Sequence, residues 1–180
     1  MRGKAAVAAL LMIGARHVCA QAAPPGVQRT NIPIPYRTYL AASPLFVPFD
    51  IGSLELESAA ASGVTTGTAL SYADIDHRRV TSLDAKLRFY PGEVVLRGFS
   101  VGLSAGWARF RRTVSDTAST VDAPAVGILA DNNWLVGPNR RFVVGVGAAL
   151  KRLIASPEER KRVDLDRVYV TGRFVVGYAF

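Results

Sequence analysis

The sequence is poor in cysteine, in histidine and in long hydrophobic runs, and each shortage excludes a class of protein. Among its 180 residues the only cysteine is Cys19, so no internal disulfide can form. His77 is the only histidine beyond residue 17, so any histidine base would have to be this residue. No stretch after residue 23 offers the ~20 apolar residues of a membrane-spanning helix. A disulfide framework and a helical membrane protein are therefore excluded.

Residues 1–22 have the pattern of a secretory signal peptide. Residues 1–4 form a short basic region, and residues 5–15 are apolar and broken only by glycine. Small residues follow, and we place cleavage after Ala22, with Ala20 as the alternative. Cys19 would be discarded with the signal. The proline-rich residues 23–36 cannot pair in a sheet and are expected to form a periplasmic lead-in.

Apolar residues are abundant elsewhere, but they alternate with small or polar ones. The hydrophobic fraction is 49% and the mean hydropathy is +0.20. We count eight alternating segments, at residues 37–47, 50–60, 64–75, 82–90, 98–109, 124–136, 141–151 and 166–180. Alternation places apolar residues on one face of a strand, and ~9–11 residues cross a bilayer at a tilt. Since open sheet edges cannot face lipid, residues 37–180 predict an all-β, eight-stranded, antiparallel up-and-down transmembrane β-barrel.

The connections between these segments also alternate in character. Residues 62–63, 92–93 and 137–139 have the composition of tight turns, whereas residues 74–81, 111–121 and 154–165 are longer and polar. Short periplasmic turns and longer outer loops are typical of outer-membrane barrels. The pattern therefore predicts the orientation of every strand.

The last segment carries the most specific signal. Phe174, Val176, Tyr178 and Phe180 fall on every second position, so they share one face of the strand. A free edge of this kind would promote aggregation of a soluble protein. It is expected here to close the barrel, with lipid covering its apolar face.

This aromatic terminus, together with residues 87–92 (Leu-Arg-Phe-Tyr-Pro-Gly) and 142–148 (Phe-Val-Val-Gly-Val-Gly-Ala), resembles small bacterial outer-membrane barrels of the OmpA/OmpX/OmpW-like group. The resemblance implies a location in the bacterial outer membrane. It also implies that Phe174, Val176, Tyr178 and Phe180 form the assembly signal that the barrel-assembly machinery reads. We expect a monomer.

Charged residues of both signs share the inward face of the expected barrel. They are Glu55, Glu57, Asp84, Lys86, Arg88, Asp131, Lys151, Arg167 and Arg173. Buried charges must pair, and an eight-stranded barrel is narrow enough for side chains to fill. We therefore expect a salt-bridged lumen charge network that plugs the barrel. A narrow channel for small solutes is the alternative, and a soluble lipocalin-like periplasmic barrel, with aromatic residues inside and charges outside, is the third interpretation.

Basic residues gather in or beside the expected outer loops. They are Arg78, Arg79, Arg109, Arg111, Arg112, Arg152, Arg160, Lys161 and Arg162. Guanidinium groups match phosphate geometry, so these residues are predicted to contact lipopolysaccharide or external partners, with solvated rim charges as the alternative. Nucleic acid fits the charge of +8 but not the location.

Asp74, Asp76 and His77 form the only cluster with a catalytic appearance. No Ser-His-acid spacing accompanies them, and aspartates in loops are usually turn formers. The sequence therefore predicts a protein that is not an enzyme, with no cofactor and no metal, whose role is structural or interactional.

Overall fold

The protein is described here by a computed structural model that covers residues 36–75, 78–92, 94–114 and 117–180. The predicted signal peptide and nearly all of the lead-in lie outside these residues. Eight antiparallel strands form one closed barrel in sequence order. The elements are β1 (Thr38–Ala42), the 3-10 helix η2 (Pro44–Phe49), β2 (Ile51–Ala61), β3 (Val64–Ile75), β4 (Arg78–Phe89), β5 (Gly98–Val114), β6 (Thr117–Val136), β7 (Phe142–Leu153), α2 (Pro157–Val163) and β8 (Val168–Ala179).

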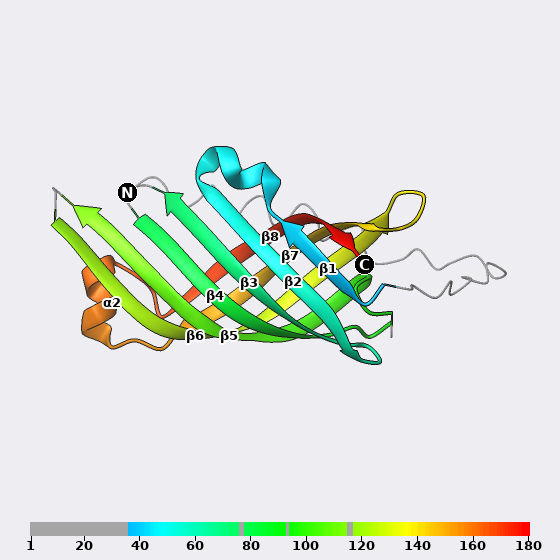
Figure 1. Cartoon of the computed structure of the whole chain (residues 1–180). Helices are drawn as coiled ribbons and strands as arrows, with labels where there is room; N and C mark the ends of the chain where they lie inside the picture. The colour runs from blue at the N-terminus through cyan, green and yellow to red at the C-terminus, as the bar shows by residue number, and fades with distance from the viewer. Residues whose placement is uncertain (1–35, 76–77, 93, 115–116) are drawn as a thin grey trace, which may run out of the picture. The chain divides into compact units, whose positions relative to one another are not determined.

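The barrel closes between its first and last strands. Tyr39 of β1 lies opposite Ala179 of β8, and Ala42 lies opposite Val176. The strands run obliquely around the barrel, and the helix α2 lies at the far ends of β5 and β6, away from the C-terminus (Figure 1). We call these the α2 end and the terminus end. Closure confirms the predicted up-and-down topology and leaves no free sheet edge among the described strands.

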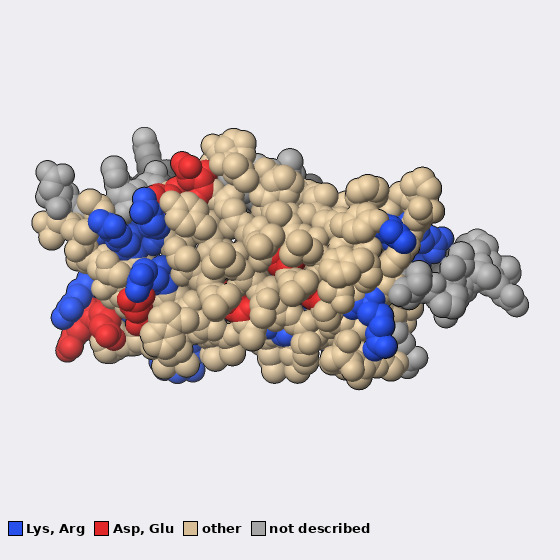
Figure 2. All heavy atoms as spheres, viewed as in Figure 1, with Lys and Arg blue, Asp and Glu red and all other residues tan. Residues whose placement is uncertain are grey.

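Alternation along each strand separates an apolar outer face from a charged inner face. Leu103 and Ile128 are both 59% exposed on the outside, whereas Arg88 is 1% exposed and Glu57 is fully buried inside. These faces are the reverse of those expected for a lipocalin-like barrel. Figure 2 shows that charged side chains on one face of the molecule gather towards its two ends, with mostly uncharged residues between them.

The first strand is shorter than predicted. We expected a strand over residues 37–47, but β1 ends at Ala42 and η2 follows at Pro44. Proline lacks a backbone N–H and cannot continue a ladder, and Pro48 recurs inside the 3-10 helix. The chain thus leaves the barrel wall before returning in β2.

The lengths of several connections also differ from the prediction. The expected outer loops at 74–81 and 111–121 are wrong, because β3 and β4 run to Ile75 and from Arg78, and β5 and β6 run to Val114 and from Thr117. The tight turn expected at 92–93 belongs instead to a longer connection between Phe89 and Gly98. Among the described connections at the α2 end, residues 43–50 between β1 and β2 contain η2 and residues 154–167 between β7 and β8 contain α2, so both are longer than tight turns.

Among the described residues, no helix has the length and hydrophobicity needed to cross a membrane.

Candidate functional site in the barrel lumen

Glu55, on the inner face of β2, lies at the centre of a group of ion pairs. Its carboxylate oxygens lie 2.5 Å from Lys86 Nζ, 2.7 Å from Arg173 Nη2 and 3.2 Å from Arg88 Nη2. The hydroxyl of Tyr39 also donates a hydrogen bond to it. Glu55 is 2% exposed, so its charge depends on these partners rather than on water.

Glu57, the next inward residue of β2, accepts a second set of bonds. The Tyr39 hydroxyl lies 2.6 Å from Glu57 Oε2 and shares its single proton between Glu57 and Glu55. Thr65 Oγ1 donates to Oε1 at 2.5 Å and the Tyr90 hydroxyl donates to it at 2.8 Å. Arg88 forms an ion pair with Oε2. Both oxygens of this buried carboxylate are therefore hydrogen-bonded, as a charge removed from water requires.

Arg88 of β4 joins the acidic groups. Besides Glu55 and Glu57, its guanidinium pairs with Asp131 of β6, with Nε 2.7 Å from Oδ2. The planar fork of arginine presents donors in several directions, which a lysine ammonium at this place could not do with the same geometry. One buried cation thus faces three carboxylates on two strands across the lumen.

Arg173 extends the network to β8. Its Nη1 donates to Asn133 Oδ1 at 2.9 Å, and Asn133 Nδ2 donates in turn to the Tyr90 hydroxyl at 3.1 Å. Tyr90 follows the last residue of β4, and its hydroxyl donates to Glu57. The network consequently ties together side chains from opposite walls of the barrel.

A separate ion pair lies nearer the α2 end. Lys151 Nζ of β7 is 2.6 Å from Asp84 Oδ2 of β4, and Ser82 Oγ donates to the same oxygen at 3.1 Å. Counting both groups, the acids Glu55, Glu57, Asp84 and Asp131 balance the bases Lys86, Arg88, Lys151 and Arg173. The inner face has no net charge in these pairs.

Glycines on the inner face provide the space that these side chains occupy. A Cβ added at Gly147 would lie 1.7 Å from Asp131 Oδ1, and one at Gly145 would lie 2.4 Å from Asn133 Oδ1. A Cβ at Gly106 would lie 2.6 Å from Asp84 Oδ1. The small residues predicted on the inner faces of β5 and β7 are therefore not open space, because polar side chains from neighbouring strands lie against them.

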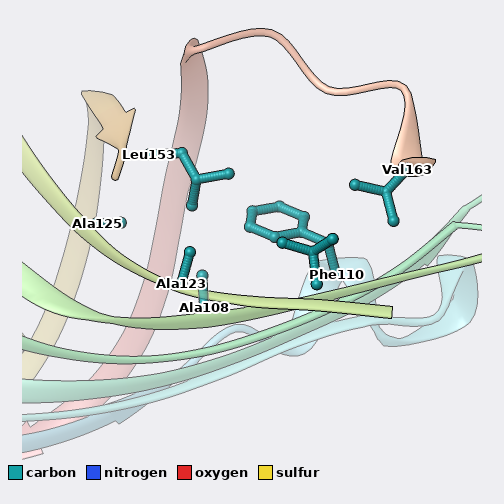
Figure 3. Close-up of a cluster of buried hydrophobic side chains, with 7 residues drawn as sticks. Ala108, Phe110, Ala123, Ala125, Leu153 and Val163 are labelled. Carbon is teal, nitrogen blue, oxygen red and sulfur yellow. The ribbon is translucent and has the colours of Figure 1, made fainter. Parts of the chain in front are cut away.

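An apolar group, the α2-end cluster, lies between the ion pairs and the helix α2. It consists of Ala108, Phe110, Val121, Ala123, Ala125, Leu153 and Val163. Figure 3 shows Val163 of α2 pointing towards Phe110 and Leu153 of the barrel wall. The helix is held by a capping box, in which the Ser156 side chain and Glu159 bond each other's backbone N–H groups. A short helix thus places one valine at the barrel mouth.

A second apolar group, the terminus-end cluster, lies at the opposite end. It consists of Tyr39, Ala41, Leu96, Val143, Val175 and Ala179. Leu96 comes from the connection between β4 and β5 and is fully buried, although its φ of 65° is unusual for a residue other than glycine. Side chains from outside the barrel wall therefore lie at both ends of the charged layer.

The structure brings most of the predicted lumen residues together, with one exception. Glu55, Glu57, Lys86, Arg88, Asp131 and Arg173 form one network, and Asp84 and Lys151 form the second pair. Arg167 is placed elsewhere: it lies just before β8, is exposed, and forms no ion pair with any described residue. It shares the inward parity of Arg173, but the strand has not yet begun there.

The predicted lipopolysaccharide-facing residues lie on strands and on α2 rather than in irregular loops. Arg78 and Arg79 begin β4, Arg109, Arg111 and Arg112 lie in β5, Arg152 lies in β7, and Arg160, Lys161 and Arg162 lie in α2. Several are already paired on the surface. Arg78 and Arg112 contact Asp164 at 2.7 and 3.6 Å, Arg79 contacts Asp74 at 2.8 Å and Arg109 contacts Asp122 at 2.7 Å.

In the predicted Asp74–Asp76–His77 cluster, the carboxylate of Asp74 forms an ion pair with Arg79. The other two members lie outside the described residues. In the part of the chain that the structure describes, no group of three acidic, histidine or cysteine side chains could hold a metal ion.

The predicted assembly signal lies on the outer face of the closing strand. Phe174 is half-buried there, and Val176, Tyr178 and Phe180 are exposed. The Tyr178 hydroxyl accepts a hydrogen bond from Arg141 Nη1 at 2.8 Å, and its ring packs edge-on against Phe142. Phe142 and Tyr178 therefore form a small aromatic group that faces away from the lumen.

Among solved structures, the chain is similar to the N-terminal β-barrel domain of Pseudomonas aeruginosa OprF. The identity is 18%, the match covers 80% of this chain and 96% of that domain, and the TM-score is 0.48. Neither a family model nor a curated protein matches the sequence.

The sequence analysis missed the uncharged members of the lumen network. Tyr39, Thr65, Tyr90 and Asn133 supply the hydroxyl and amide groups that complete the coordination of Glu55, Glu57 and Arg173. Their inward parity was available: Tyr90 continues the series of Arg88, and Thr65 alternates with the outward residues of its strand. A search restricted to charged residues could not find them.

Proposed function

We propose that the protein is an outer-membrane barrel whose lumen is closed by its own side chains. Its α2 end would make the functional contacts, with lipopolysaccharide or external partners. The observation that carries this proposal is the network around Arg88, in which charged groups on opposite walls meet within hydrogen-bonding distance. The clusters around Val163 and Leu96 support it, because apolar side chains lie at both ends of the charged layer.

The outer-membrane location is supported by the outer face of the barrel. Leucine, isoleucine and valine side chains there are exposed around the whole wall, an arrangement that water would penalise and lipid would accept. Aromatic residues such as Phe99 and Trp134 are exposed nearer the terminus end, as in an interfacial girdle. The assembly signal in β8 would be read by the barrel-assembly machinery, and the barrel would act as a monomer.

The α2 end would face outwards and contact lipopolysaccharide or external partners through its basic residues. Arg111, Lys161 and Arg162 are exposed there and form no ion pair with a described residue, so their charge is available to phosphates. The role is structural or interactional rather than enzymatic.

Planar-bilayer recording tests whether the lumen is closed. The wild-type barrel is expected to give no steady single-channel current, because ion pairs fill its centre. The double variant Glu55→Ala/Arg173→Ala removes a facing acid and base, keeps the charge balanced and empties part of the lumen, so small currents are expected from it. Steady, reproducible currents from the wild type would instead establish the alternative, a narrow channel for small solutes.

A further inference from the structure

A pocket of about 660 Å³ lies where the connection between β7 and β8 leaves the barrel wall. Three arginines line it, namely Arg152, Arg160 and Arg167, together with Glu159 and the apolar Val126 and Ile154. Arg152 lies opposite Val168, and Arg167 O accepts a hydrogen bond from Leu153 N at 2.9 Å. The pairing of β7 with β8 therefore holds two of the arginines at adjacent strand ends.

The helix α2 holds the third. Arg160 N donates to Ser156 O at 3.1 Å, and Leu165 N donates to Arg160 O at 3.0 Å, so both backbone groups of Arg160 are fixed. Its side-chain Nε is buried and has no hydrogen-bond partner among the described residues. A buried donor without an acceptor is costly, and a bound anion would satisfy it.

These three arginines differ from the other arginines of the α2 end. Arg78, Arg79, Arg109 and Arg112 each pair with an aspartate. The pocket arginines form no ion pair with any residue that the structure describes. The one carboxylate in the pocket, Glu159, already accepts from Ser156 N at 2.8 Å, and this bond lowers its pKa and keeps it ionised. The lining therefore carries three positive charges against one negative charge.

An apolar groove runs from the pocket along the outer wall. This second hollow, of about 710 Å³, shares Val126 and Arg152 with the pocket and is lined beyond them by Leu103, Ile128, Leu150 and Val168. All four are exposed on the outer face. A cationic pocket that opens onto an apolar groove matches a ligand with an anionic head and a hydrocarbon tail.

We propose that this pocket binds the phosphate group of a membrane lipid, whose acyl chain lies in the groove. The proposal rests on the proposed function, because that function places the groove against lipid. Guanidinium forks bind phosphate oxygens in pairs, and the unsatisfied Arg160 Nε gains an acceptor. A free phosphate would use the arginines alone, whereas a lipid uses both the arginines and the groove.

Native mass spectrometry of the folded full chain in an uncharged maltoside detergent tests the proposal. The probe is dipalmitoyl phosphatidic acid, compared with dipalmitoylglycerol, which lacks the phosphate, and with inorganic phosphate, which lacks the chains. One phosphatidic acid is expected to stay bound per barrel, and both comparison ligands are expected to bind at least tenfold more weakly.

Arg160→Gln and Arg167→Gln are expected to weaken phosphatidic acid binding by about tenfold each, since each removes a charge-assisted bond. The control Arg97→Gln removes an exposed charge from the β4–β5 connection at the terminus end, outside the pocket lining, and should leave binding unchanged. Equal losses in all three variants, or equal binding of dipalmitoylglycerol, would overturn the proposal. Equal binding of inorganic phosphate would identify a site for a free anion instead. Because the readout needs only a folded barrel, it is independent of membrane location and conductance.

Discussion

Arg88 shows at the scale of one residue how this barrel uses charge in place of an apolar core. Its guanidinium is 1% exposed and lies among Glu55, Glu57 and Asp131. Removing two or more charges from water costs several kcal/mol each, so the pairs stabilise the barrel only while they are complete. Deleting one member therefore has a larger effect than the strength of a single surface ion pair suggests.

Arg88→Ala is expected to lower the free energy of unfolding by about 3–5 kcal/mol, because it leaves buried carboxylates without their cation. Arg111→Ala removes an exposed arginine of β5 and is expected to change stability by less than about 0.5 kcal/mol. Urea titration of barrels folded into lipid vesicles, followed by tryptophan fluorescence, measures both. Equal effects of the two variants would contradict the buried network.

The outer face allows a matching test at Leu103 of β5, which lies midway between the exposed Phe99 and Trp107. Leu103→Arg is expected to destabilise the folded barrel in vesicles by roughly 2–4 kcal/mol, the cost of a lipid-facing arginine near the bilayer midplane. Thr113→Arg lies on the same face of β5 near the α2 end and is expected to cost about 0–1 kcal/mol. If Leu103→Arg proves as harmless as Thr113→Arg in the same titration, lipid does not cover this wall.

At the scale of elements, the lengths of the strands divide the barrel into two parts along its axis. The parts of the strands near the terminus end close the ring, while β5 and β6, with 17 and 20 residues, run well beyond the ~9–11 residues that a bilayer requires. The helix α2 packs against these extensions through Val163. The α2 end is therefore a folded structure of its own, which explains why the basic residues sit on regular elements.

The closing strand gives the test at this scale. Phe180 contributes backbone bonds to the seam, since its O accepts from Thr38 N at 3.1 Å and its N donates to Thr38 O at 2.8 Å. Phe180→Ser keeps these bonds and removes only the exposed ring, so a loss of assembly would report recognition of the aromatic terminus. We expect a severalfold decrease of folded barrel in membranes, measured on gels without boiling.

Phe142→Ser is the control for this experiment. Phe142 is also an exposed aromatic at the terminus end, 53% against 59% for Phe180, but it begins β7. It should reduce the yield of folded barrel much less. A similar decrease in both variants would mean that the rings act through interfacial packing rather than as a terminal signal.

At the scale of the whole molecule, closure into a ring and the reversal of polarity between inside and outside are the decisive features. Every described strand pairs on both sides, so the barrel offers lipid a wall without a free ladder of polar groups. The charges that remain visible on the surface lie mostly towards its ends (Figure 2).

The proposed outer-membrane location is testable directly. The protein is expected in the outer-membrane fraction of a Gram-negative host and should migrate faster on gels before boiling than after it, because a closed barrel resists detergent. Recovery from the soluble periplasmic fraction, with one mobility at all temperatures, would contradict the outer-membrane proposal.

The sequence by itself determined the class of fold, the number of strands and the face on which residues within the strands lie. These properties depend on the two-residue period of a strand, which is local, so Glu55, Arg88 and Arg173 could be assigned to the lumen without knowing their neighbours. The same period misplaced Arg167, because parity has no meaning before the strand begins.

Only the tertiary structure decided which inward groups meet. Strand register and tilt bring Arg88 to Asp131, and leave Asp84 to pair with Lys151. They also place the bare backbone of Gly147 beside Asp131, and they allow β5 and β6 to continue where a polar loop was expected. Such contacts join residues far apart in the chain, and their geometry is set by closure of the ring rather than by any local pattern of residues.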